Sequence, residues 1–178
     1  MPKFLVLLTA LASAGFLAMP SGSARGQVAG AQTTPVSGQI IAGWVENGWI
    51  GSPPIKVKVK LDTGARNSSI SAPQYREFEK NGRPYVSFTL INNEGREVDI
   101  ERPVKRMATV RSAGAGKSAR PVVMLKICVA GVTSEVEFTM ADRTKMRYPI
   151  LIGRSFLAEK LLVDSARTFL ASGLCQKN

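Results

Sequence analysis

Short hydrophobic segments separated by turn-forming residues make up most of the chain after residue 38. From Ile55 to Leu61, apolar residues alternate strictly with three lysines, which predicts a strand with one buried face and one solvated lysine face. Ile150-Leu151-Ile152 is a short, wholly apolar run, which predicts a strand buried on both faces. Further strands are predicted at 40–41, 44–45, 49–50, 85–91, 98–100, 102–110, 120–129, 132–140, 162–163 and 168–171.

The segments between these strands predict turns and one helix. Asn47-Gly48 is a strong two-residue hairpin signal, and residues 92–95 predict another turn. The small residues at 112–117 predict the tip of a long hairpin. Ser155 to Leu161 predicts one short helix, with Ser155 as a candidate N-cap. The pattern as a whole predicts an all-β domain of sandwich or barrel type.

The N-terminus has the organisation of a secretory signal. Lys3 precedes an apolar segment of 16 residues from Phe4 to Met19, and small residues follow from Pro20 to Ala24. Since about 20 apolar residues are needed to span a bilayer, we expect no stable membrane span. We expect a signal peptide at 1–26, cut after Ala24 or Gly26, a flexible leader at 27–38 and one domain at 39–178. The protein is then expected to be secreted, to the periplasm in a bacterium.

Composition restricts the chemistry. The chain of 178 residues has no histidine, which excludes Ser-His-Asp and Cys-His catalysis and every His-assisted zinc site. Two cysteines cannot supply a four-thiolate zinc site. We therefore expect no metal and no other cofactor, and any catalysis must use the remaining side chains, carboxylates above all.

The net positive charge is compatible with several classes of partner and does not identify one. Removal of Lys3 and Arg25 with the signal peptide leaves 22 basic against 13 acidic residues, a net charge of +9. Such a surplus favours anionic partners, although scattered, solvated lysines are the more ordinary explanation. No basic run with interleaved aromatic residues is present, so no nucleic-acid partner is expected.

Cys128 and Cys175 are the only thiols. In an exported chain they could form a disulfide. Alternatively, Cys128 is a buried strand thiol and Cys175 a separate thiol near the C-terminus. The sequence leaves both possibilities open, because it does not fix the distance between them.

Asp62-Thr63-Gly64-Ala65 directly follows the lysine-faced strand. A carboxylate at a strand end, followed by a hydroxyl that can bond backbone and a glycine that permits a tight turn, is rigidly held. Two such carboxylates about 3 Å apart share one proton and together activate a water molecule. On these residues alone, an ordinary surface turn fits as well.

The order of segments carries more information than the triplet. Leu61 to Ala65, followed downstream by Ile150 to Arg154, resembles the retropepsin-like aspartic proteases. The resemblance implies an acid-protease half, a closed β-barrel with one short helix after Gly153-Arg154. It assigns catalysis to Asp62, the supporting loop to Thr63, Gly64 and Ala65, and the packing strand to Ile152, Gly153 and Arg154. The flap corresponds loosely to Gly114, Ala115, Gly116 and Lys117.

A narrower resemblance is to a bacterial group labelled ATP-dependent zinc proteases. It is carried by residues 41–46, 60–65, 85–88, 120–122 and 142–143. The residues support neither half of that label. No histidine is available for zinc, and Arg111 stands where a phosphate-binding loop needs a glycine.

One Asp-Thr-Gly per chain implies a homodimer, in which each copy contributes Asp62 across a twofold axis. The chain also departs from the retroviral pattern, which has an acidic residue where Arg66 and Asn67 stand. That departure leaves Arg154 without an obvious partner. Arg66 either lowers the pKa of Asp62 or points to solvent.

The principal hypothesis is a secreted, homodimeric aspartic endopeptidase acting on peptides or proteins. The alternative is a non-catalytic periplasmic module on the same fold that binds peptides or polyanions. A nucleotide-dependent enzyme is a third hypothesis, resting on Gly116-Lys117-Ser118 alone.

Overall fold

The computed structural model describes residues 38–112 and 116–175. The chain divides into two units, Met1–Pro35 and Val36–Asn178, and the described residues belong to the second. The predicted signal peptide, most of the predicted leader and the flap residues Gly114 and Ala115 lie outside the described residues.

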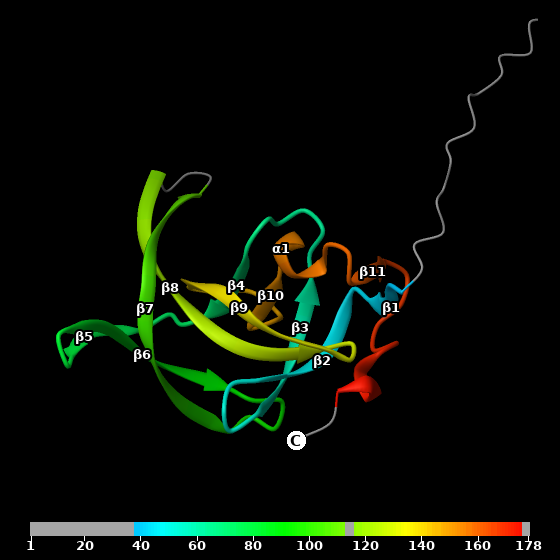
Figure 1. Cartoon of the computed structure of the whole chain (residues 1–178), viewed down its shortest axis with the longest axis horizontal. Helices are drawn as coiled ribbons and strands as arrows, with labels where there is room; N and C mark the ends of the chain where they lie inside the picture. The colour runs from blue at the N-terminus through cyan, green and yellow to red at the C-terminus, as the bar shows by residue number, and fades with distance from the viewer. Residues whose placement is uncertain (1–37, 113–115, 176–178) are drawn as a thin grey trace, which may run out of the picture. The chain divides into compact units, whose positions relative to one another are not determined.

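The regular structure of the described chain is mostly β-strand, with one short α-helix and one 3₁₀ turn, which confirms the predicted all-β class (Figure 1). The elements are β1 (Ile40–Gly43), β2 (Val45–Ile50), β3 (Ile55–Leu61), β4 (Ser68–Ser71), β5 (Arg76–Lys80), β6 (Arg83–Ile91), β7 (Glu97–Ser112), β8 (Gly116–Val129), β9 (Val132–Ala141), β10 (Ile150–Ile152), α1 (Arg154–Leu157), β11 (Leu161–Asp164) and η1 (Ser172–Leu174). No helix in the described ranges has the length and hydrophobicity to cross a bilayer.

Two sheets organise these strands. Nine strands follow the order β2-β3-β10-β4-β9-β8-β7-β6-β5, and β1 pairs with β11 in parallel. The closed barrel expected from the resemblance is wrong for this sheet. A short antiparallel contact joins β2 to β8. Beyond β8, however, the sheet continues through β7 and β6 to β5, which pairs only with β6 among the described strands. The nine-stranded sheet as a whole is therefore not a closed barrel, because β7, β6 and β5 extend it as an open wing.

The predicted lysine-faced strand is β3, with the predicted bounds. Its apolar side chains are buried and Lys56 and Lys58 are exposed, as the alternation required. The wholly apolar β10 lies between β3 and β4, parallel to β3 and antiparallel to β4. This central position explains why β10 has no polar residue.

Asn47-Gly48 does not form the predicted turn. Both residues lie inside β2, paired with Lys58 and Val57 of β3. A Cβ at position 48 would lie 3.0 Å from the carbonyl oxygen of Cys128. The glycine thus serves the close approach of β8 to β2, and the actual turn follows at residues 51–54.

Two C-terminal expectations are also corrected. The helix begins at Arg154 rather than at Ser155 and ends at Leu157, with Gly153 at the N-cap position and no side-chain cap. The predicted strand at 168–171 is irregular, because its backbone amides bond to other partners. Phe169 donates to the Val45 carbonyl at 2.8 Å.

Glu46 fastens this irregular segment to the start of the domain. Its carboxyl group is fully buried and accepts hydrogen bonds from the amide of Gly43 at 2.7 Å and the amide of Ala171 at 3.1 Å. The hydroxyl of Ser172 donates to the other carboxyl oxygen. A buried polar group is tolerated when it is hydrogen-bonded in this way.

A disulfide joins Cys128 of β8 to Cys175, so of the two possibilities left open by the sequence the structure has the bonded pair. The carbonyl of Cys175 also accepts a hydrogen bond from the indole of Trp49 at 3.2 Å. The segment after β11 is therefore attached to the sheet at both of its ends.

The predicted long hairpin is formed by β7 and β8. The hairpin extends away from the neighbouring strands (Figure 1). Gly116 pairs with Ser112 and Lys117 with Arg111 at its outer end, and Gly116 and Lys117 are exposed. These two residues of the expected flap lie at the start of β8, next to the undescribed tip.

Candidate active site

Asp62 immediately follows β3, where α1 lies against the end of the strand (Figure 1). Its amide donates to the carbonyl of Ile152 at 2.9 Å, which extends the parallel pairing of β3 with β10 by one residue. Leu61, just before it, donates to the carbonyl of Trp44 at 2.9 Å. The backbone that carries the carboxylate is therefore held from two sides.

The carboxylate itself is oriented by its own loop. Oδ1 accepts hydrogen bonds from the amides of Gly64 at 3.0 Å and Ala65 at 3.2 Å. Oδ2 pairs with the ammonium group of Lys60 at 3.2 Å. The Asp62 side chain retains 24% of its exposure, so the group is fixed but accessible.

These contacts determine the ionisation of Asp62. Partial burial raises the pKa of the carboxyl group, but the side-chain hydrogen bond from Lys60, the amide of Gly64, the charge of Lys60 and the amide of Ala65 together lower it below its ordinary value of 3.8. Because each of these donors stabilises the charged form, an isolated copy holds Asp62 ionised at neutral pH.

The partners of Arg154, which the sequence did not reveal, are backbone carbonyls of the Asp62 loop. Its Nη1 donates to the carbonyl of Thr63 at 2.8 Å and to that of Gly64 at 2.9 Å. The amides of Arg154 and Ser155 donate to the carbonyls of Ala65 and Arg66 at 2.9 and 3.0 Å. The first turn of α1 thus receives its capping carbonyls from the Asp62 loop, which makes a Ser155 side-chain cap unnecessary.

Gly153 permits this contact. A Cβ at position 153 would lie 2.6 Å from the carbonyl oxygen of Asn67 and 2.8 Å from that of Arg66. The amide of Gly153 donates to the buried hydroxyl of Ser68 at 3.1 Å. The segment Ile152–Arg154 and the Asp62 loop therefore approach at backbone distance.

Arg143 is a second cation near Asp62. It is half-buried, and its guanidinium donates to the carbonyl of Tyr148 at 3.2 Å and to the hydroxyl of Ser69 at 3.3 Å. Burial lowers the pKa of Arg143, while the negative charge of Asp62 raises it. Arg66, by contrast, has an exposed side chain, so the cation that pairs with Asp62 is Lys60.

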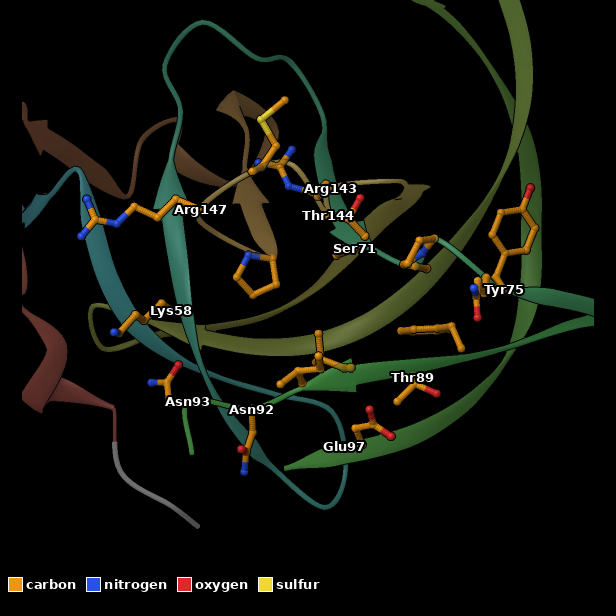
Figure 2. A pocket seen from close by; sticks show the side chains of 18 of the residues that line it. Lys58, Ser71, Tyr75, Thr89, Asn92, Asn93, Glu97, Arg143, Thr144 and Arg147 are labelled. Carbon is orange, nitrogen blue, oxygen red and sulfur yellow. The ribbon is translucent and has the colours of Figure 1, made fainter. Parts of the chain in front are cut away.

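A large cavity of the described chain is separate from Asp62. It has a volume of about 1070 Å³ and includes Arg143, but Asp62 does not line it (Figure 2). The carboxylate instead lies in the exposed loop next to α1. Asp62 lines none of the three best-formed cavities of the described chain.

The predicted loop and packing-strand residues come together around one carboxylate. Lys60, Ser68 and Arg143 were not assigned to the site from the sequence. Lys60 could have been identified, because residues two apart on a strand share a face and Lys60 precedes Asp62 by two. Ser68 and Arg143 reach the site through long-range packing and carried no such signal. Within the described ranges, no cluster of three or more potential His, Cys, Asp or Glu metal ligands occurs.

Comparisons with known proteins agree with this arrangement. A solved structure of a Legionella pneumophila protein of unknown function superposes with a TM-score of 0.62 and 30% identity, covering 74% of this chain and 97% of that one. A Shewanella pealeana protein named "Probable alpha-L-glutamate ligase" is 37% identical over 67% of this chain, and a Desulfotalea psychrophila protein of the same name is 28% identical over 69%. Neither carries the zinc-protease label.

The chain spans only 26% and 27% of the length of these two relatives. The match that covers the domain is to the family model RimB-like, described as retropepsin-like aspartic endopeptidase RimB, over residues 41–173. That range contains every strand of the structure except the first residue of β1, together with the Asp62 loop, Gly153 and Arg154. This chain therefore belongs to the RimB-like family of retropepsin-like proteins.

Proposed function

We propose that this protein is an aspartic endopeptidase that hydrolyses peptide bonds as a homodimer, with one Asp62 from each copy. The observation that carries the proposal is the carboxylate of Asp62, held by the amides of Gly64 and Ala65 in a loop that Arg154 fastens to α1. Family membership supports the same reaction. The sequence has a single Asp-Thr-Gly, so the second carboxylate has to come from a second copy.

In such a dimer the two carboxyl groups share one proton, because two like charges about 3 Å apart cannot both ionise. The ionised group accepts a proton from water as the water oxygen attacks the peptide carbonyl carbon. The protonated group donates its proton to the carbonyl oxygen, which gives a neutral tetrahedral diol. Proton transfer to the amide nitrogen then breaks the C–N bond and releases a carboxylic acid and an amine.

The charge beside Asp62 supports an acidic peptide as substrate. Lys60 precedes Asp62 by two residues, and its ammonium group pairs with the Asp62 carboxylate at 3.2 Å. A glutamate side chain next to the scissile bond would pair with Lys60 and remove that cation from Asp62. Relatives named as glutamate ligases support the choice of glutamate, although this chain matches only part of them.

We also propose that the protein acts after export. The apolar segment from Phe4 to Met19 and the small residues up to Gly26 support removal of a signal peptide. The disulfide between Cys128 and Cys175 supports an oxidising compartment such as the periplasm.

One observation favours a second function, a non-catalytic module that binds peptides or polyanions. Lys60 pairs with Asp62 at 3.2 Å and opposes the proton sharing that catalysis needs. If no acidic substrate displaces Lys60, the fold would bind anionic chains without cleaving them.

The deciding experiment incubates the purified mature protein with peptide libraries rich in glutamate, lysine or neutral residues. Asp62→Asn is the test variant, and Asp99→Asn, an exposed carboxylate on β7, is the matched control. We expect cleavage of glutamate-rich peptides by the wild type and by Asp99→Asn, inhibition by pepstatin-type compounds, and no cleavage by Asp62→Asn. Cleavage retained in Asp62→Asn would exclude the proposed mechanism.

Sedimentation provides the second criterion. The active protein should sediment as a dimer, and activity should fall with the square of concentration once the dimer dissociates. An active monomer would exclude the shared pair of Asp62 carboxylates. A monomer that binds acidic peptides without cutting them would establish the binding module instead.

A further inference from the structure

Apart from Arg143, the cavity of about 1070 Å³ is bounded by parts of the chain that the proposed reaction does not use. Its walls come from β3, the segment leading into β5, the β6–β7 turn and the loop 142–149 (Figure 2). The turn is fastened to β3, because the amide of Asn93 donates to the carbonyl of Lys56 at 3.0 Å. At about 1070 Å³ the cavity is at the upper end of the range for small-molecule sites.

The charges that line this cavity are strongly unbalanced. Lys58, Arg76, Arg143 and Arg147 line it, and Glu97 is its only acidic residue. Figure 2 shows Lys58, Arg143 and Arg147 on the side of the cavity away from Glu97. Four cations around one concave surface raise the local positive potential, which an anionic ligand would neutralise.

Apolar side chains are exposed in the same cavity. Ile91 is 54% exposed and Met146 is 60% exposed, and both line it. Behind them, Phe88 and Leu90 close the wall from the buried core. Both side chains therefore present apolar surface to the cavity that an apolar part of a ligand could cover.

A second, smaller hollow of about 450 Å³ continues from the same cations. It shares Lys58 and Arg147 with the large cavity and adds the aromatic rings of Trp44, Tyr148 and Phe169. The rings of Trp44 and Tyr148 meet edge to face, with centroids 5.8 Å apart. Lys58 and Arg147 therefore lie between two hollows that each contain apolar surface.

We infer that this cavity binds an amphiphilic anion, a carboxylate or phosphate group attached to an apolar chain. The anionic group would pair with Lys58 and Arg147, and the chain would cover Ile91 and Met146. A neutral lipid would leave the cations unpaired, and a chain of acidic residues would place charges against the apolar wall, which is unfavourable. The inference does not depend on hydrolysis at Asp62.

Calorimetry with the mature protein tests the charge requirement. The probes are dodecanoate, dodecyl phosphate and dodecan-1-ol, below their micellar concentrations. We expect both anions to bind, and their relative affinity indicates which anionic group the cavity prefers. The alcohol should bind at least about tenfold more weakly, a difference of about 1.4 kcal/mol in binding free energy. Equal binding of the alcohol would overturn the inference.

Two matched pairs of variants locate the ligand. Lys58→Gln should weaken anion binding about tenfold, whereas Lys56→Gln, on the same strand face but outside the cavity, should change it less than twofold. Met146→Gln should weaken binding, whereas Met107→Gln, at an exposed methionine of β7 that does not line the cavity, should not. Unchanged binding in both Lys58→Gln and Met146→Gln would overturn the proposed location.

Two further measurements separate this site from the proposed active site. Asp62→Asn should bind dodecanoate as the wild type does, because Asp62 does not line the cavity. A glutamate-rich decapeptide should not displace dodecanoate. Displacement that is lost in Lys58→Gln would overturn the inference and make the cavity part of a peptide-binding cleft.

Discussion

Arg154 donates a hydrogen bond to the carbonyl of Thr63 at 2.8 Å and so joins the first residue of α1 to the loop that carries Asp62. The two residues are far apart in sequence, and the contact is made with backbone rather than with an acidic side chain. The Arg154 contact therefore does not need an acidic side chain at position 66 or 67, where this chain departs from the retroviral pattern.

Replacement of Arg154 by lysine should reduce peptidase activity more than it reduces stability. An ammonium group cannot reproduce the Nη1 contacts to the carbonyls of both Thr63 and Gly64 in the same geometry. Because Arg154 is exposed, we expect a stability loss of about 1 kcal/mol or less. Arg102→Lys is the control, since Arg102 also donates from Nη1 to a carbonyl, that of Glu101. Equal activity in the two variants would contradict a positioning role.

Gly153→Ala should destabilise the fold by about 2–3 kcal/mol, because the added methyl group would lie 2.6 Å from backbone atoms of Asn67. Gly173→Ala, where no heavy atom lies within 4 Å of the added Cβ, should stay within about 0.5 kcal/mol of the wild type. Urea denaturation of both variants measures the difference. A similar midpoint for the two would mean that the loop and the packing strand separate at little cost.

Lys60→Met should raise the pKa of Asp62, since Lys60 supplies both the side-chain hydrogen bond and the nearby charge that lower it. In the wild type the pKa of Asp62 is lower in the folded than in the unfolded protein. The ion pair therefore stabilises the fold above about pH 4, and this stabilisation is lost as the pH falls through the folded-state pKa.

Carboxyl-carbon NMR titration of Asp62 measures this pKa directly, with Lys56→Met as the control on the same strand. The stability difference between the wild type and Lys60→Met should disappear at the acid end of the titration. A pKa of Asp62 that is the same in Lys60→Met and the wild type would show that the loop amides alone set it.

Reduction of the disulfide should lower the free energy of unfolding by about 4 kcal/mol, the loop-entropy value for a separation of 47 residues. Denaturation with and without reductant measures the loss. A variant with serine at both Cys128 and Cys175 should already be destabilised and should not respond to reductant. A wild type that is insensitive to reductant would show that the other contacts of the C-terminal segment are sufficient.

The parts of the fold that the sequence predicted are those governed by local burial. The bounds of β3 follow from Val57 and Val59 pointing inward while Lys58 points outward, a pattern that only a half-buried strand produces. Asp62 lies at the end of this strand because it directly follows Leu61 in the sequence. The partners of Asp62 within its own loop, Gly64 and Ala65, are equally local.

The parts that could not be predicted depend on contacts between distant segments. Gly48 resembles a turn residue, yet its missing side chain makes room for the carbonyl of Cys128. Ser155 resembles an N-cap, yet the carbonyls of Ala65 and Arg66 satisfy the helix amides instead. Arg143 lies near Asp62 because β9 and β10, the strands on either side of it in the sequence, both pair with β4.

Glu46 has a practical consequence for anyone shortening or tagging this protein. Two of its three hydrogen-bond donors, the amide of Ala171 and the hydroxyl of Ser172, come from beyond the last strand. A version that stops at Leu170 would leave an acidic group in the interior with only the amide of Gly43 to solvate it. Expression boundaries should therefore run past Cys175, and affinity handles belong after that residue.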